Sequence, residues 1–520
     1  MKKLTLSTAR LAVLMAVLTA VSKLLGFVRE MVLANYFGAG PVTDAYIMAQ
    51  SIPNNLMAAV ISAVGTSYLP AFSAKNEKEG REAADRFTSQ LVDLQLLIIA
   101  AVVALGCLLA RPLISVFAPG FSGETADLTA WYLRFAFFVL FFSVLTYIFG
   151  AWLNYKGVFL PQIVYAVAAN LVLITVVAIS ASTDRRLLII GPLASAALTG
   201  TAHFIRAKKE GFRYTPDFSL SEGVKEVIGL AVPIFIGGYV SQINLAIDKI
   251  LASGLAEGCV SALNYANQII GSISGLTVTI FVTILYPRLN MAYVQGDHER
   301  MSDLSERGIR LIWILAVPLS FGLICYAPDV IRLLFERGAF SAAATKLTSS
   351  ALVFYSIGLA FLSLNTLITK IYYSMHDTKT AVKCSAVSVL LNIVLNLVLV
   401  GPMGHAGLAL ATSISYMANT ALLGYTFTRR YPSIRLISSF KAPLQILAVS
   451  AVSVGCSRLV YSAAGTGIVR LALCCALAVV LYLATLKLLR FQELDLIYQL
   501  FGRGRKSGDA PSGGEGSREE

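Results

Sequence analysis

Long apolar segments alternate with short polar links along almost the whole chain. Many of these segments are as long as, or longer than, the roughly 20 residues that a helix needs to cross a hydrocarbon core. The pattern therefore predicts an all-α integral membrane protein with about fourteen transmembrane helices. The predicted helices span residues 8–36, 42–72, 87–115, 125–154, 158–181, 187–206, 224–253, 259–291, 307–333, 342–374, 380–400, 405–429, 440–461 and 467–490.

Every second link between these segments is basic, which predicts an orientation in the membrane. Short loops rich in Lys and Arg stay on the cytoplasmic side of a membrane, so both termini are expected in the cytoplasm. Two links on the other side, one with Arg185 and Arg186 and one with Arg337, break this rule. The basic links contain Lys75, Lys78, Arg81, Arg86; Lys156; Arg206, Lys208, Lys209, Arg213; Arg288, Arg300; Lys379, Lys383; and Arg429, Arg430, Arg435, Lys441.

A weak internal repeat divides the chain into two similar halves at an offset of about 219 residues, as from Tyr46 to Tyr265. Further along, Phe117 with the segment 120–122 parallels Phe335 with the segment 338–341. Repeats of six helices are a common way to build a two-lobed transporter. We expect an N-lobe over residues 1–215, a pseudo-symmetric C-lobe over 216–432, two further helices over 433–492, and a cytoplasmic tail over 493–520 with a disordered end.

Composition narrows the class of protein. Hydrophobic residues make up 57% of the chain and charged residues 14%, against about 25% charged in soluble domains. The net charge of +13 lies mostly in short links rather than on one continuous face, so nucleic acid is not an expected partner. Metalloprotease, serine-hydrolase, nucleotide-loop and glycosyltransferase motifs are missing from the sequence. A transporter is therefore predicted rather than an enzyme.

Charges inside the first apolar segment are the first candidates for function. Lys23, Arg29 and Glu30 lie there, and charge within a membrane span is costly unless it faces a cavity or a partner. The two cations could hold an anionic group such as a diphosphate. Alternatively, Lys23 extends toward the membrane surface and Arg29 pairs with Glu30 or Asp44.

A second candidate site combines an acid with two amides. Asp248 lies in the middle of a predicted span, and Asn392 and Asn396 are one helical turn apart, so both amides face the same side. Their oxygens could bind a hard cation such as sodium. Alternatively, the asparagines hydrogen-bond to a neighbouring helix, as they often do in membranes.

Several motifs resemble the MurJ (MviN) family of lipid II flippases, in the multidrug/oligosaccharidyl-lipid/polysaccharide exporter superfamily. The likeness covers essentially the whole chain. The motifs are the segment 22–30 (Ser-Lys-Leu-Leu-Gly-Phe-Val-Arg-Glu), Phe37-Gly38-Ala39-Gly40, Thr43-Asp44-Ala45-Tyr46, Ile52-Pro53-Asn54, the segment 262–267 and Ile284-Leu285-Tyr286-Pro287.

The resemblance implies a carrier in the bacterial cell membrane that alternates between inward-open and outward-open states and moves the polyprenyl-diphosphate-linked peptidoglycan precursor to the outer leaflet. It implies that the last two helices form a groove for the prenyl tail. It favours a monomer whose partners are lipid II and membrane lipids. No cofactor is expected except a possible sodium ion. The implied substrate-binding residues are Lys23, Arg29, Glu30, Asp44, Asn54 and Gln268. The implied sodium ligands are Asp248, Asn392, Asn396, the backbone carbonyl of Leu408, and Thr412.

The chain also departs from the family pattern. Cavity arginines of the family fall at or beside Met57 and at Gln268, and Asn396 stands where some members have aspartate. These departures leave open a flippase for another polyprenyl-diphosphate oligosaccharide, or a cation-coupled drug antiporter of the same superfamily.

Overall fold

The computed structural model describes residues 2–439, 441–464, 467–489 and 491, and over these ranges it contains helices and no strand. The predicted tail over 493–520 lies outside the described residues. The first half of the chain forms α1 (Lys2–Phe37), α2 (Pro41–Glu79), α3 (Arg81–Leu108), α4 (Ala110–Phe117), α5 (Gly123–Tyr155), α6 (Leu160–Ser182), the short 3₁₀ helix η1 (Arg185–Ile189) and α7 (Ile190–Lys209). The second half forms α8 (Glu222–Ser253), α9 (Cys259–Val294), α10 (His298–Phe335), α11 (Ala342–Ser374), α12 (Thr378–Met403), α13 (His405–Arg430), α14 (Lys441–Ala464) and α15 (Ile468–Leu488).

The predicted all-α membrane fold is confirmed. Each predicted apolar segment coincides with a long described helix, with two exceptions. Leu109 separates the third segment into α3 and α4, and the sixth segment begins within η1 and continues as α7. Among the described residues, 10 helices are long and apolar enough to cross a membrane; the count of fourteen stays a prediction. The largest error in bounds is at α10, which begins at His298 rather than 307 because Asp297 caps a polar first turn that carries no apolar pattern.

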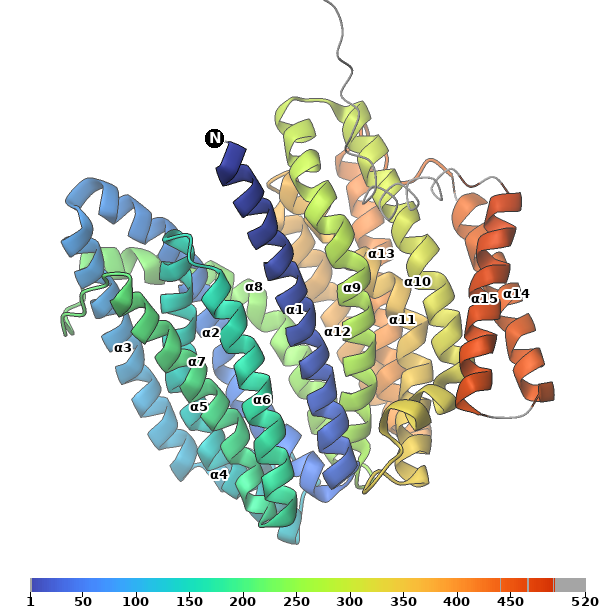
Figure 1. The fold of residues 1–520 in the computed structure, drawn as a ribbon, viewed down its shortest axis with the longest axis horizontal. Helices are drawn as coiled ribbons and strands as arrows, with labels where there is room; N and C mark the ends of the chain where they lie inside the picture. The colour runs from blue at the N-terminus through green and yellow to red at the C-terminus, as the bar shows by residue number, and fades with distance from the viewer. Residues whose placement is uncertain (1, 440, 465–466, 490, 492–520) are drawn as a thin grey trace, which may run out of the picture.

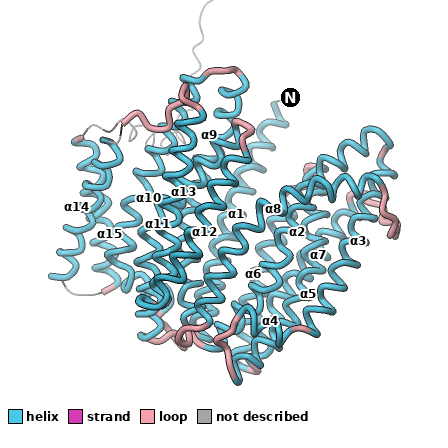
Figure 2. The backbone as a smooth tube through the Cα atoms, turned by 180° about the vertical axis from the view of Figure 1, so that it is seen from behind, coloured by secondary structure: helices cyan, strands magenta, loops and turns pink. Residues whose placement is uncertain are grey.

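The helices form two groups that diverge toward one end of the molecule (Figures 1 and 2). Helices α2–α7 make one group and α9–α13 the other, while α1 and α8 run between them. Helix α8 packs along α2 and also contacts α12, and the pair α14–α15 lies against the far side of α10. We call the divergent end, which carries the N-terminus and the basic links, the basic end, and the opposite end the closed end.

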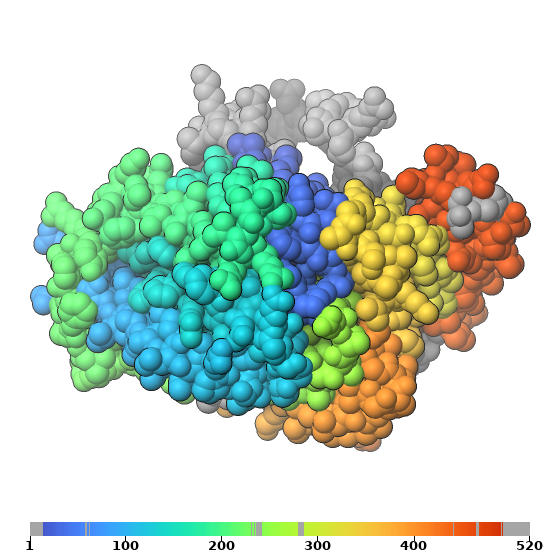
Figure 3. Space-filling model, turned by 90° about the horizontal axis from the view of Figure 1, so that it is seen from below, coloured from blue at the N-terminus to red at the C-terminus, as the bar shows by residue number. Residues whose placement is uncertain are grey.

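At the closed end, two equivalent links of the predicted repeat each contact the first helix of the other half. Gly120, in the link between α4 and α5, packs against the backbone of Ser253 at the end of α8. Gly338, in the link between α10 and α11, packs against Asn35 near the end of α1, where the Ala339 amide donates to the Asn35 carbonyl at 2.8 Å. Figure 3, viewed from this end, shows the two halves meeting here. The reciprocal contacts give the weak sequence repeat a structural counterpart.

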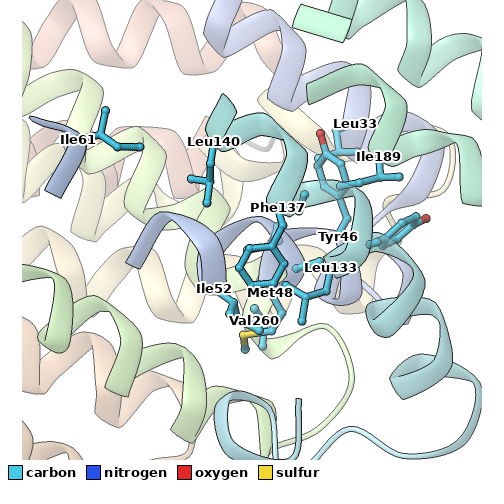
Figure 4. Close-up of a cluster of buried hydrophobic side chains, with 14 of the residues drawn as sticks. Leu33, Tyr46, Met48, Ile52, Ile61, Leu133, Phe137, Leu140, Ile189 and Val260 are labelled. Carbon is cyan, nitrogen blue, oxygen red and sulfur yellow. The ribbon is translucent and has the colours of Figure 1, made fainter. Parts of the chain in front are cut away.

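The interior of the N-terminal group fixes the position of α2. Met48 and Ile52 of α2 pack against Leu133 and Phe137 of α5, with Leu140 one turn further along, and all five are at most 2% exposed (Figure 4). Close packing of this kind holds helices together in a membrane, where lipid tails are as apolar as the side chains. This packing holds α2 in place against α5, and with it the polar side chains that α2 carries.

The link between the two halves is anchored to α3. Asp93 accepts hydrogen bonds from the Tyr214 hydroxyl at 2.5 Å and from the Asp217 amide at 2.9 Å. Asp217 in turn forms an ion pair with Arg86 at 2.7 Å. Hydrogen bonds from Ser219, and then the one from Arg86, hold the pKa of the Asp217 carboxyl well below its usual range. The link is thus fastened to the N-terminal group before α8 begins.

The C-terminal pair is attached to α10 by polar contacts as well as by packing. Asp329 of α10 is buried and accepts hydrogen bonds from Arg458 at 2.9 Å and Tyr461 at 3.0 Å, both of α14. On α15, the Tyr482 hydroxyl donates to the Ile314 carbonyl of α10 at 2.8 Å. Such contacts fix a helix pair in place where hydrophobicity alone does not choose a partner.

Candidate functional site

A polar cavity of about 370 Å³ lies where the two groups of helices meet. It is lined mainly by α1, α2, α8 and α9, with α6 and α7 at its edge. Six side-chain amides face it, together with two cations and one carboxylate. The polar lining consists of Arg29, Glu30, Tyr46, Gln50, Ser51, Asn54, Asn55, Gln242, Lys249, Asn264 and Gln268.

The cavity lies between the closed end and the divergent helices. On α1, Arg29 precedes the closed-end residue Asn35 by six positions, or roughly 9 Å of helix. On α2, Asn54 lies ten positions past Asp44, roughly 15 Å deeper. Because the closed-end contacts lie beyond the cavity on both helices, the cavity faces the basic end.

Arg29 combines the two roles that the sequence left open. It lines the cavity, and its guanidinium forms an ion pair with Glu30 at 2.6 Å. The Arg29 side chain is 29% exposed and that of Glu30 is 9% exposed. Because the two charges are paired, the free-energy cost of placing each one inside the membrane is reduced. The guanidinium donors that do not contact Glu30 remain available to a ligand.

The other predicted substrate-binding residues divide into two sets. Asn54 and Gln268 line the cavity with Arg29 and Glu30. Lys23 is exposed on α1 and is not part of the lining, which agrees with the alternative in which it extends toward the membrane surface. Asp44 is also outside the lining, although it is 2% exposed.

Asp44 instead joins the two groups at the closed end. Its carboxylate accepts hydrogen bonds from the Gly258 amide at 2.6 Å, the Ser261 amide at 2.7 Å and the Ser261 hydroxyl at 2.6 Å. The free amides at the start of α9 and the positive end of its dipole favour a carboxylate in this position. Asp44 therefore stabilises closure between α2 and α9, a role that its place on the same helix as the cavity residues of α2 did not reveal.

Sequence reasoning missed Lys249, which points into the cavity from α8. Its ammonium donates a hydrogen bond to the Ser51 hydroxyl of α2. The signal was available, since Lys249 is a second charge within the same predicted span as Asp248. What the sequence could not give is the direction of α8, which turns Lys249 toward α2 and Asp248 toward α12 and α13.

The predicted sodium ligands lie together on the other side of α8. The Asn396 amide nitrogen donates to the Asp248 carboxylate at 2.6 Å and to the Asn392 oxygen at 2.8 Å. The Thr412 hydroxyl lies 3.5 Å from Asp248 and donates to the Leu408 carbonyl at 3.0 Å. All five residues are under 9% exposed.

The chemistry of this cluster fits a hard cation. It combines a carboxylate with amide, hydroxyl and backbone oxygens, which are the ligands that such ions prefer. The Asn396 side-chain oxygen is buried and has no hydrogen-bond partner in the described part of the chain. Turning that amide by half a rotation exchanges its nitrogen for this oxygen and would add one more ligand beside Asp248.

Comparisons with known proteins agree with one another. A family described as "Lipid II flippase MurJ" matches residues 33–475. The probable lipid II flippase MurJ of Rickettsia prowazekii is 28% identical over 446 residues, covering 83% of this chain and 86% of that protein.

Solved structures share the fold. A lipid II flippase MurJ in an inward closed conformation superposes with a TM-score of 0.79 at 24% identity, covering 94% of this chain and 100% of the other. An inward-facing multidrug resistance transporter of the MATE family, in the MOP superfamily, superposes with a TM-score of 0.65 at 14% identity, covering 80% of this chain and 96% of the other. The chain therefore shares its arrangement of helices with both of these structures.

Proposed function

The chain belongs to the MurJ family of lipid II flippases, and from this premise we propose that it carries lipid II from the inner to the outer leaflet by alternating access. The observation that carries the proposal is the amide-rich cavity between two repeats, closed at one end by contacts that repeat symmetry relates. A carrier of this kind exposes one central site to each side in turn.

The basic end is proposed to face the cytoplasm. The positively charged links gather at that end together with the N-terminus. Two of the three arginines that broke the charge rule at the closed end are engaged locally, since Arg185 pairs with Glu124 and Arg186 lies over the Trp131 ring. In this orientation the cavity faces inward, where newly made precursor is available.

The cavity is proposed to hold the polar headgroup. Six amides offer both donors and acceptors, which suits the hydroxyl and amide groups of a sugar-peptide. Arg29 is placed to contact the diphosphate, with Glu30 fixing the orientation of the guanidinium. Because these residues come from one chain, a monomer is sufficient for the proposed site.

A sodium ion at Asp248 is proposed to bias the two access states. The ligand cluster joins α8 to α12 and α13, so an ion there would strengthen one arrangement of α8 against the C-terminal group. An ion shifts such an equilibrium only if its affinity differs between the two states.

The prenyl tail is proposed to lie along α14 and α15. Large apolar side chains of this pair remain more than half exposed, among them Leu444, Leu459, Val469 and Leu473. These surfaces face lipid in a membrane protein, and they continue the apolar outer face of the C-terminal group.

Genetic rescue tests the proposal. A bacterium depleted of its own lipid II flippase should survive when this chain is expressed, whereas a carrier of another lipid-linked glycan or of drugs would not rescue it.

Arg29→Ala should lower plating efficiency about tenfold or more, because a charge-assisted hydrogen bond contributes about 1.5–3 kcal/mol. Arg29→Ala leaves the Glu30 carboxylate without its partner, and the double variant Arg29→Ala/Glu30→Gln removes that charge as well. The double variant should rescue no better than Arg29→Ala alone. Full rescue by Arg29→Ala, at equal protein in the membrane, would show that Arg29 does not bind substrate.

A further inference from the structure

We infer that Lys249 is the principal anion-binding residue of the cavity, taking the diphosphate of the lipid substrate in place of the Ser51 hydroxyl. The inference rests on the proposed function, which supplies a substrate with a diphosphate group. It assigns the binding of this diphosphate to a residue of α8. The carrying observations are the placement of Lys249 in the cavity wall and the absence of a carboxylate partner for it among the described residues.

The charges of the cavity point to Lys249 rather than Arg29. Among the described lining residues only Arg29, Glu30 and Lys249 carry charge. The Arg29–Glu30 pair sums to zero, so the net positive charge of the wall comes from Lys249. A diphosphate brings at least two negative charges, and an ammonium not already neutralised gains most from meeting them.

The present partner of Lys249 is a weak competitor. The Ser51 hydroxyl is neutral, and it already donates to the Ile47 carbonyl of its own helix at 2.6 Å. When an oxyanion replaces this hydroxyl at the ammonium, Ser51 keeps its bond to Ile47. An ion pair thus replaces a hydrogen bond to a neutral hydroxyl, and Ser51 is not left without a partner.

The position of Lys249 also places the anion beside the proposed sodium site. Consecutive helical residues point about 100° apart, since one turn takes 3.6 residues. Asp248 consequently faces Asn396 and Thr412 while Lys249 faces the cavity. A cation at Asp248 offsets the negative charge nearest to Lys249, which strengthens the attraction of Lys249 for an anion. Diphosphate and sodium should therefore each increase the affinity for the other.

The test measures the binding of three ligands, all with the same prenyl chain, to purified full-length protein in nanodiscs. Farnesyl diphosphate, farnesyl monophosphate and farnesol share the prenyl chain and differ only in the headgroup, which carries two, one or no phosphate groups. Lys249→Met should weaken farnesyl diphosphate binding about tenfold or more and leave farnesol binding within about twofold of the unmodified protein. Lys249→Arg should retain diphosphate binding, and Ser51→Ala should bind it as tightly or more tightly. Lys23→Met is the matched control, because this lysine lies in α1 outside the cavity, and it should bind all three ligands normally.

Two results would overturn the inference. Equal diphosphate affinity in Lys249→Met and the unmodified protein is one, and an equal loss for all three ligands, which marks a purely structural role, is the other. If Lys249→Met does not fold, Lys249→Gln replaces it in the same comparison. Failure of the genetic rescue, with diphosphate binding still dependent on Lys249, would instead reject lipid II as the substrate while leaving this assignment intact.

Discussion

At the scale of single residues, several polar groups inside the membrane region have partners that the sequence only partly revealed. Arg29 pairs with its neighbour Glu30, which the sequence offered as one alternative. Asp248 meets Asn392 and Asn396 as the spacing and the family resemblance together suggested. Asp44 was assigned to substrate but accepts hydrogen bonds at the start of α9, and two of its three donors are backbone amides that no residue pattern marks.

A prediction at this scale concerns charge at the sodium site. Asn396→Asp should raise sodium affinity on the order of tenfold, because affinity rises with the number of charged ligands. Ligands that bind the folded state raise the unfolding temperature. The measurement is the unfolding temperature in sodium chloride against choline chloride, where the sodium-specific increase should be larger than in the unmodified protein.

Asp248→Asn supplies the control for this experiment. It removes the carboxylate while keeping the size of the side chain, so the sodium-specific increase should disappear. A sodium-specific increase that persists in Asp248→Asn would place the ion elsewhere.

At the scale of elements, the apolar pattern was sufficient to locate the helices but not the links. Helices such as α11 agree with their predicted bounds because membrane crossing imposes both length and composition. The links at the closed end depend on backbone conformation, and glycines there allow close approach. Gly338 adopts φ +59°, and an added Cβ would lie 2.3 Å from the Asn35 carbonyl oxygen.

A matched pair of glycines separates this contact from backbone strain. Gly404, between α12 and α13, also has φ +59°, but an added Cβ there would meet nothing within 4 Å. Both Gly338→Ala and Gly404→Ala place a Cβ at a positive φ, which costs roughly 1–3 kcal/mol, and only the first also clashes across the closed end. Distances between spin labels at the closed end should lengthen in Gly338→Ala and stay unchanged in Gly404→Ala. Identical distance distributions in the two variants would contradict the assigned role of Gly338.

At the scale of the whole molecule, the repeat was a better guide than any single motif. Its collinear matches predicted two related halves, and the structure places the equivalent links at Gly120 and Gly338 against the ends of α8 and α1. The repeat did not reveal that α8 would run along α2, between the two groups of helices. Interhelical packing of this kind depends on the shapes of facing surfaces, which are brought together only in the folded chain.

The central claim is that the cavity must open alternately to the two sides, and a reversible lock on the closed end tests it most directly. Asn35 and Ala339 lie in contact across this end, so Asn35→Cys/Ala339→Cys, in a variant whose seven native cysteines are replaced, can join them by a disulfide. Translocation of fluorescent lipid II in reconstituted vesicles should stop on oxidation and return on reduction, while either single-cysteine variant is unaffected. If the fully crosslinked protein transports lipid II as fast as the same protein after reduction of the disulfide, alternating access through this cavity is contradicted.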